Sequence, residues 1–274
     1  MPISRASERS ERAAGQPPPR LRRPAGASAK AGAERGSRGP ASDGVGESEG
    51  RSPSEEKRAV LWDLDGTLVD SAELHWLSWR DTLAADGVHI TYQQFLETFG
   101  QKNDRILPGW LGEGTSAERI RQVGDAKEAE YRRLVQARGL TPLPGAAEWL
   151  RTLHAAGWKQ AIASSAPGAN VAVMLRVLGV DTELDAIVSA EDVTIGKPDP
   201  QVFVRAAAAV GVPVRRCVVV EDAVVGIEAA RRAGMKTIGV TRVPGFEADL
   251  VVASLEDLPA DAFTRLIGDE AADG

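Results

Sequence analysis

From residue 144 onward, short apolar runs alternate with segments whose apolar residues recur at helical spacing. Another apolar run lies earlier, at residues 59–62. We predict strands at these runs: 59–62, 160–163, 186–188, 217–220, 237–240 and 250–252. Helices are predicted between the later runs: 146–156, 170–178, 201–210 and 224–233. Strands separated by helices need crossover connections, which favour a parallel sheet covered by helices on both faces.

Residues 72–140 have a different pattern, because their apolar residues recur only at helical spacing and no run is typical of a strand. We predict helices at 72–86, 92–99, 104–107 and 117–137. Ser71 suits the N-cap of the first helix, and Pro108-Gly109 is expected to end the third. The predicted fold class is α/β: a doubly wound parallel sheet, with a helical domain inserted after the first strand.

This interpretation divides the chain into three parts. A Rossmann-like three-layer core takes residues 58–71 and 141–274, and the helical domain takes residues 72–140. Residues 1–57 are rich in Ser, Arg, Gly, Pro, Ala and Glu and almost free of aliphatic side chains. Such a segment buries too little apolar surface to offset its ordering entropy, so we predict a disordered low-complexity tail.

The tail carries a basic run at residues 20–23. This run suits contact with nucleic acid or an anionic surface, but a solvated tail explains it more simply. A targeting peptide is another reading, although the scattered acids Glu8 and Glu11 and the lack of an apolar helical face count against it. A start codon assigned too far upstream is a third.

Composition narrows the setting of the whole chain. It has 274 residues and a net charge of −6, which argues against nucleic acid as the main partner of the core. Cys217 is the single cysteine and opens an apolar run, so we expect a packed core thiol in a reducing compartment. No apolar run approaches the ~20 residues of a membrane-spanning helix. We therefore expect a cytoplasmic monomer without a membrane partner.

Polar and charged side chains follow the predicted strands at the points where the strands end. Because the carboxyl ends of parallel strands meet at one edge of a sheet, we expect these side chains to share one site. They are Asp63 and Asp65, Ser164 and Ser165, and Glu221 and Asp222, joined by Lys197 from a loop before a helix. Alternation along a strand puts Asp63 and Asp65 on the same side, and Gly66 permits a sharp turn directly after them.

Like charges this close repel, so a folded protein needs a cation, a shared proton or bound phosphate chemistry there. Carboxylate oxygens on separate loops suit Mg²⁺, which normally bridges to a substrate phosphate. Ser164 can donate a hydrogen bond to a phosphoryl oxygen, and Lys197 can neutralise the charge of the group in transfer. One aspartate can then attack phosphorus to form an aspartyl-phosphate, while the other protonates the leaving oxygen. Each motif alone is common; their joint placement predicts phosphoryl transfer.

These four blocks, in this order, resemble the haloacid dehalogenase superfamily of phosphotransferases. Residues 63–71 resemble its first motif, Ser164 its second, Lys197 within residues 196–200 its third, and Glu221-Asp222 its fourth. The continuation of the fourth motif through residues 223–235 is similar to the beta-phosphoglucomutase-like branch. The resemblance covers residues 58 to about 255 and leaves the tail outside.

The resemblance implies a role for each residue. Asp63 would be the nucleophile and Asp65 the acid/base. Mg²⁺ would be held by Asp63, the backbone carbonyl of Asp65, and Asp222, with Glu221 assisting directly or through water. Ser164, followed by Ser165, and Lys197 would bind the transferring phosphate. The presence of Asp65 argues against a dehalogenase, and the phosphonatase pattern also differs at this place.

In this superfamily the inserted helical domain is a cap, and substrate identity depends on it. Residues 73–76 resemble the cap-entry segment of the mutases, with His75 at the matching position; His75 is either a polar hinge residue or a ring packed against Trp79. The mutases use a cap arginine for a second phosphate, and the similar loop at 100–105 lacks arginine at that place. Lys102 and Arg105 are the candidates to replace it, although ammonium and guanidinium are not equivalent for phosphate.

Two departures from the mutases favour a phosphatase. One is the missing cap arginine; the other is Ala166 and Gly168, which stand where the mutases have polar substrate contacts. We therefore predict a Mg²⁺-dependent phosphatase acting on a small phosphorylated metabolite such as a sugar phosphate. A beta-phosphoglucomutase-like phosphosugar mutase is the alternative. A non-enzymatic binding or regulatory protein, acting through its basic tail, ranks last because every catalytic residue of the family is present.

Overall fold

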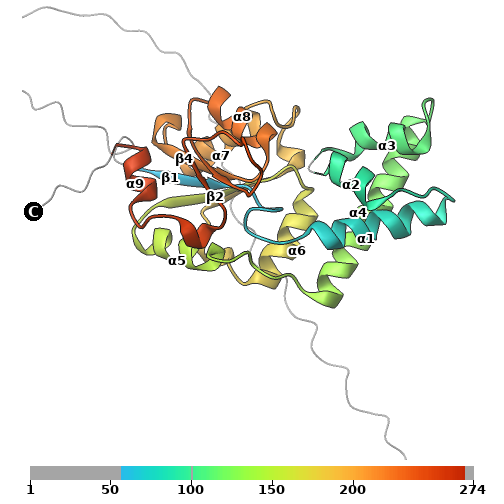
Figure 1. The fold of residues 1–274 in the computed structure, drawn as a ribbon, viewed down its shortest axis with the longest axis horizontal. Helices are drawn as coiled ribbons and strands as arrows, with labels where there is room; N and C mark the ends of the chain where they lie inside the picture. Colours follow the sequence, from blue (N-terminus) through green and yellow to red (C-terminus); the bar gives the residue numbers. More distant parts are fainter. Residues whose placement is uncertain (1–56, 100, 269–274) are drawn as a thin grey trace, which may run out of the picture. The chain divides into compact units, whose positions relative to one another are not determined.

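A computed structural model describes residues 57–99 and 101–268 of the chain. In these ranges one parallel sheet has the strand order β3-β2-β1-β4-β5-β6. Figure 1 labels β1, β2 and β4 of this sheet. The strands are β1 (Ala59–Trp62), β2 (Lys159–Ala163), β3 (Ala186–Val188), β4 (Cys217–Glu221), β5 (Lys236–Val240) and β6 (Leu250–Val252). The chain order reverses between β1 and β4, and the crevice at such a reversal is where open α/β sheets bind ligands. The predicted tail lies outside the described residues, except for its last residue.

Side chains of β1 alternate between two hydrophobic cores, one on each face of the sheet. Val60 and Trp62 pack with α5 (Ala146–Ala155), α6 (Gly168–Leu178) and α9 (Ala262–Leu266). Ala59 and Leu61 pack with α7 (Gln201–Val210) and α8 (Val224–Arg232). Helices therefore cover both faces of the sheet (Figure 1), which confirms the predicted three-layer, doubly wound arrangement.

Four helices lie between β1 and α5, and the described residues of this stretch contain no strand. They are α1 (Ala72–Ala85), α2 (Tyr92–Thr98), α3 (Asn103–Leu111) and α4 (Ala117–Arg138). We call residues 72–140 the helical insertion. Its helix α4 packs against α1 and also against α6 of the core. Neither α4 nor any other helix in the described ranges is long and apolar enough to cross a membrane.

The third helix of the insertion corrects a prediction. Pro108 does not end it, because α3 continues through Pro108 to Leu111. Trp110 and Leu111 pack against the apolar cluster of the insertion, and the Trp110 ring meets the Trp79 ring edge-on with centroids 5.1 Å apart. This tertiary packing offsets the cost of a proline inside a helix, about 3 kcal/mol. Other boundaries differ from prediction by one or two residues, where helix and strand ends are least well defined.

Cys217 is a packed core thiol, as predicted. Its side chain is fully buried at the start of β4, and its Sγ lies 3.4 Å from the Pro213 carbonyl oxygen. Burial raises the pKa of the Cys217 thiol to about 12. A thiol with this pKa stays protonated and unreactive near neutral pH.

Gln160 joins β1, β2 and α5 from inside the core. Its side chain is fully buried, and its Oε1 accepts a hydrogen bond from Trp62 Nε1 at 3.0 Å. Its Nε2 donates to the Leu150 carbonyl at 2.7 Å. Trp62 directly precedes Asp63, so these bonds fix the end of β1 from which Asp63 projects.

We predict that Gln160→Leu lowers the free energy of unfolding by about 1–3 kcal/mol, because the buried Trp62 N–H and Leu150 carbonyl lose their partner. Urea unfolding followed by tryptophan fluorescence measures the change. Gln136→Leu, at an exposed position of α4, is the matched control and should change the free energy by less than about 0.5 kcal/mol. Equal unfolding midpoints for the two variants would contradict the prediction.

Candidate active site

The backbone turns sharply after β1 and brings Asp63 and Asp65 to the edge of the sheet. The Asp63 N–H still belongs to the sheet, since it donates to the Val220 carbonyl of β4 at 3.0 Å. Gly66 has a φ of +85°, a left-handed conformation that glycine adopts without steric cost. Its N–H donates to the Val69 carbonyl at 2.9 Å and closes the turn.

Glycine at position 66 also makes room for the Asp222 carboxylate. A Cβ built on Gly66 would lie 2.1 Å from Asp222 Oδ2, far inside van der Waals contact. Thr67, the next residue, donates a hydrogen bond to Asp222 Oδ1 at 3.4 Å. The turn after β1 is thus fitted to the end of β4, and this fit holds Asp222 close to Asp63.

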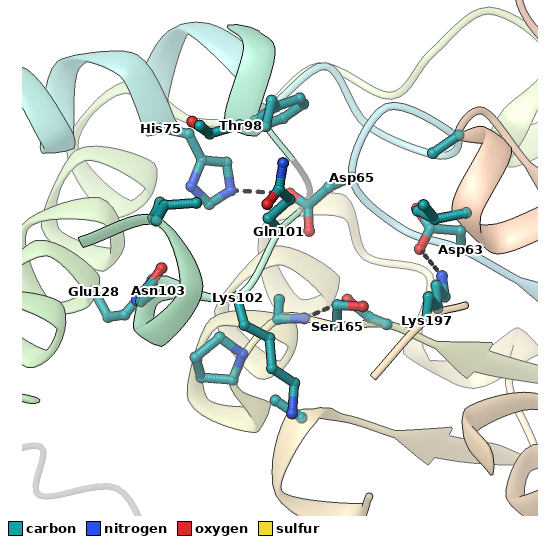
Figure 2. Close-up of a pocket in the computed structure, with 18 of the residues that line it drawn as sticks. Asp63, Asp65, His75, Thr98, Gln101, Lys102, Asn103, Glu128, Ser165 and Lys197 are labelled. Carbon is teal, nitrogen blue, oxygen red and sulfur yellow. Dashed lines mark hydrogen bonds and ion pairs between the residues drawn. The ribbon is translucent and has the colours of Figure 1, made fainter. Parts of the chain in front are cut away.

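Three carboxylates and one ammonium form the centre of the site. Oxygens of Asp63, Glu221 and Asp222 lie within 4.8 Å of one another. Lys197 Nζ lies 2.6 Å from Asp63 Oδ1 and 2.6 Å from Glu221 Oε1, and Figure 2 shows its contact with Asp63. The donor set consists of hard carboxylate oxygens from separate loops, which is the chemistry that Mg²⁺ prefers. These residues therefore fit the predicted Mg²⁺ site.

Burial and repulsion between carboxylates raise the pKa values of Asp63 and Asp222 above their ordinary values. Burial, opposed by Lys197 and reinforced by Glu221 and Asp222, holds the pKa of Asp63 well above its usual range. Burial, with repulsion from Glu221, raises the pKa of Asp222 to about 7. Burial alone would lower the pKa of Lys197, but Asp63 and Glu221 raise it above its usual value. The protein alone thus leaves negative charge incompletely balanced, which favours binding of a cation.

Asp65 has different partners from Asp63, although both line one cavity. Its Oδ1 accepts hydrogen bonds from Ser71 Oγ at 2.5 Å and from His75 Nε2 at 3.2 Å. Burial would raise the pKa of Asp65, but the His75 and Ser71 contacts lower it below its usual value. Ser71 stands before α1 as predicted, yet its hydroxyl makes no capping hydrogen bond. The predicted N-cap position is thus confirmed without a capping bond, because the hydroxyl donates to Asp65 instead.

His75 is buried between Asp65 and a lysine that the sequence pattern does not single out. Lys127 Nζ lies 2.9 Å from His75 Nδ1, and the His75 ring stacks on Tyr131 with centroids 3.9 Å apart. Burial and the Lys127 charge lower the pKa of His75. Because an ammonium group only donates, Nδ1 accepts and the ring proton lies on Nε2, facing Asp65.

All the predicted site residues line a single cavity of about 320 Å³. They are Asp63, Asp65, His75, Lys102, Ser164, Ser165, Lys197, Glu221 and Asp222. Ser164 is buried, and its Oγ accepts a hydrogen bond from the Ala166 N–H at 3.0 Å. The Lys102 side chain extends over Gly196, next to Lys197 in sequence. Arg105, the other candidate cation of the insertion, is exposed and does not line this cavity.

Several lining residues were missed by sequence reasoning. Besides Lys127, the insertion contributes Trp79, Phe95, Thr98, Phe99, Gln101, Asn103, Asp104, Ile106 and Glu128. Figure 2 shows Thr98, Gln101, Asn103 and Glu128 on the side of the cavity that carries His75. Lys127 and Glu128 stand in the highly charged helix α4, where a solvated surface is the default expectation. Only the folded position of α4 distinguishes them from its exposed charges.

Comparisons with known proteins agree with the geometry. The family model for haloacid dehalogenase-like hydrolases matches residues 57–234. Beta-phosphoglucomutase of Bacillus subtilis (strain 168) is 34% identical over 213 residues, 73% of this chain and 91% of that protein. Hexitol phosphatase B of Escherichia coli (strain K12) is 31% identical over 213 residues, which cover 74% of this chain and 94% of that protein. A crystal structure of beta-phosphoglucomutase from Clostridium difficile is similar with a TM-score of 0.70 and 25% identity, covering 78% of this chain and 98% of that chain.

We predict that Mg²⁺ stabilises the protein more as pH rises through about 7. Without the metal, the Asp222 pKa of about 7 exceeds its ordinary value of 3.8. Between these values the folded state binds the extra proton, so ionisation on raising the pH destabilises the metal-free fold. Mg²⁺ needs the ionised carboxylate and reverses that loss.

The shift of Tm between MgCl₂ and EDTA, measured by differential scanning fluorimetry, should therefore be larger at about pH 8 than at about pH 6. Asp222→Asn should remove most of this pH dependence. A shift of equal size at both pH values in the unmodified protein would contradict the assignment.

Proposed function

The chain belongs to the haloacid dehalogenase-like hydrolases, and from that premise we propose that it is a Mg²⁺-dependent phosphatase of a small phosphorylated metabolite, in the class of sugar phosphates. Family membership confirms the predicted superfamily and makes the chain an enzyme, so the non-enzymatic alternative is not retained. A cytoplasmic location and a monomeric state stay predictions.

One observation carries the proposal. Four charged residues that line the cavity lie close together. Lys197 is hydrogen-bonded to Asp63 and Glu221, and oxygens of Asp63, Glu221 and Asp222 are close enough to bind one metal ion. Burying a lysine between two carboxylates is unfavourable for a cluster without a function, because each desolvated charge costs roughly several kcal/mol. Phosphoryl transfer uses this combination, since a transferring phosphoryl group needs cations around it and a nucleophile beneath it.

We assign the first half of the reaction to Asp63 as nucleophile. An Asp63 carboxylate oxygen attacks phosphorus, a new O–P bond forms, and the bond from phosphorus to the leaving oxygen breaks. Asp65 must enter this step protonated, which the negative charge of a bound phosphate favours against its lowered pKa. It delivers that proton to the leaving oxygen, so the product leaves as a neutral alcohol. Lys197, which contacts Asp63, and Ser164, which lines the same cavity, bind the oxygens of the transferring group.

The second half reverses the role of Asp65. Water attacks the aspartyl-phosphate, Asp65 accepts a proton from that water, and Asp63 and inorganic phosphate are released. Both hydrogen bonds from Ser71 and His75 reach Asp65 Oδ1. We therefore assign proton transfer to Oδ2. Asp63, Asp222 and the Asp65 carbonyl, with Glu221 nearby, would hold Mg²⁺, which would supply positive charge to stabilise the transferring phosphoryl group.

The cations of the insertion favour hydrolysis of a phosphosugar over its isomerisation by a mutase reaction. Lys127 already contacts His75 and Glu128, and Arg105 lies outside the cavity. Among the described residues of the insertion this leaves Lys102 as the cation available for a second phosphate. A single ammonium is a weaker clamp for phosphate than a bidentate guanidinium.

The mutase alternative has its own support. The Bacillus subtilis relative at 34% identity and the Clostridium difficile structure are both beta-phosphoglucomutases. A mutase returns the phosphoryl group to a sugar and so interconverts hexose 1- and 6-phosphates without net release of phosphate. The ratio of isomer formed to inorganic phosphate released therefore separates the two activities.

We predict that the purified protein with Mg²⁺ releases inorganic phosphate from members of a panel of hexose and hexitol phosphates. Asp63→Asn should lower kcat/KM by at least about 10³-fold, because an amide nitrogen cannot replace the carboxylate nucleophile. Asp70→Asn, an exposed position at the end of the same turn, is the matched control and should retain activity.

Colorimetric phosphate release gives the rates, and ³¹P NMR identifies any isomer formed. Isomerisation that depends on a bisphosphate activator, without phosphate release, would replace the phosphatase by the mutase. Turnover by Asp63→Asn equal to that of the unmodified protein would remove both.

A further inference from the structure

Asn170 is a fully buried polar residue of α6 whose amide lies between an anion and a cation. Its Nδ2 donates to Glu128 Oε2 at 2.5 Å, and its Oδ1 accepts from Arg132 Nη1 at 2.8 Å. Glu128 and Arg132 both belong to α4 of the helical insertion. The two charges fix which way the amide points, since a flipped amide would set its NH₂ group against the guanidinium.

Glu128 is held in place by donors from three helices. Besides Asn170 of α6, Asn103 of α3 donates to its Oε1 at 2.8 Å, and Lys127 of α4 donates to the same oxygen at 3.0 Å. Only 7% of the residue is exposed. A carboxylate buried this far is stable only when its hydrogen bonds are satisfied. Among the residues that the structure describes, Asn170 is the donor to Glu128 that comes from the core.

Lys127 depends on Glu128 in the same way. Its ammonium group is buried, and Glu128 is the carboxylate with which it pairs. Burial lowers the pKa of Lys127, and the charge of Glu128 opposes this shift. A charged Lys127 donates to His75 Nδ1 and so keeps the ring proton on Nε2, where it reaches Asp65. A displaced Glu128 would loosen this whole arrangement.

We propose that Asn170 is a positioning residue for proton transfer at Asp65, acting through Glu128, Lys127 and His75. The proposal rests on the proposed phosphatase function, in which Asp65 is the acid/base. The series of contacts begins at Asn170 in the core and runs through Glu128 and Lys127 of α4 and His75 of α1. It ends at Asp65 in the core. The packing of α4 on α6 therefore affects the hydrogen bonds that Asp65 accepts.

A second contact between α4 and α6 offers a matched comparison. Tyr131 Oη lies 3.1 Å from Met174 Sδ, and Met174 is as buried as Asn170. Met174 is one helical turn further along α6; it contacts none of the charged residues of this series and touches the series only through Tyr131, whose ring stacks on His75. Met174→Leu therefore disturbs the same packing surface without removing a donor from Glu128.

The test compares two substrates that differ in their need for a general acid. An alkyl leaving group, as in a hexitol phosphate, must be protonated as it departs, whereas p-nitrophenolate leaves without a proton. Asn170→Leu should lower kcat/KM for the hexitol phosphate by about tenfold or more, and for p-nitrophenyl phosphate by less than about threefold. Met174→Leu should change both values equally. Equal losses on both substrates with Asn170→Leu, or no loss, would overturn the proposal.

A spectroscopic readout keeps the test independent of turnover. The imidazole ¹⁵N shifts of His75, assigned among three histidines with a His75→Gln variant, should report a proton on Nε2 in the unmodified protein. Asn170→Leu should shift the tautomer equilibrium, and Met174→Leu should not. An unchanged His75 spectrum in Asn170→Leu contradicts the proposal, whether or not the protein turns over substrate.

Asn170→Asp provides the same test if the leucine variant does not fold. It is nearly isosteric and keeps the acceptor for Arg132, but it sets a second carboxylate against Glu128. The same substrate-dependent loss and the same change at His75 are expected. Phosphate release by the unmodified protein, blank-corrected with Asp63→Asn, establishes the proposed function separately from these comparisons.

Discussion

Repulsion among buried carboxylates is the constraint on which this site depends. Asp63, Glu221 and Asp222 bring their oxygens within 4.8 Å of one another. Lys197 reaches two of the three and offsets part of their repulsion, and the remaining negative charge favours a bound cation. The close fit of Gly66 against Asp222 follows from the same demand, because the carboxylates must approach from separate strands. In the proposed function, Lys197 and a bound cation would together present positive charge to the phosphate group.

Asp63 and Asp65 begin as one repulsive pair in the sequence and end in different surroundings. Asp63 belongs to the charged centre with Lys197, while Asp65 is held by Ser71 and His75 from the direction of the insertion. The turn at Gly66 separates them and leads directly into α1. In the proposed reaction, the nucleophile Asp63 would therefore be held by the sheet, and the acid/base Asp65 by residues of the turn and the insertion.

The core could be predicted from sequence because its signals are local. β1, β2 and β4 are apolar runs followed by predicted site residues, so topology alone gathers Asp63, Ser164 and Asp222. The insertion was harder, because tertiary contacts override local rules there. Packing of Trp110 carries α3 through Pro108, and α4 buries Lys127 and Glu128 although its pattern is that of a polar helix. Such pairings involve residues far apart in sequence and leave no periodic signal.

The proposed reaction requires Asp63 to carry the phosphoryl group transiently during turnover. The most direct measurement is mass spectrometry of the protein quenched in acid during turnover of a sugar phosphate and then digested. A phosphoryl group is expected on Asp63 of the unmodified protein and none in Asp63→Asn. In Asp65→Asn given p-nitrophenyl phosphate, whose leaving group needs no proton, its occupancy should be higher because water is no longer activated. Phosphate release with no phosphoryl group on Asp63 in either active protein, or with the group on another residue, would contradict the account.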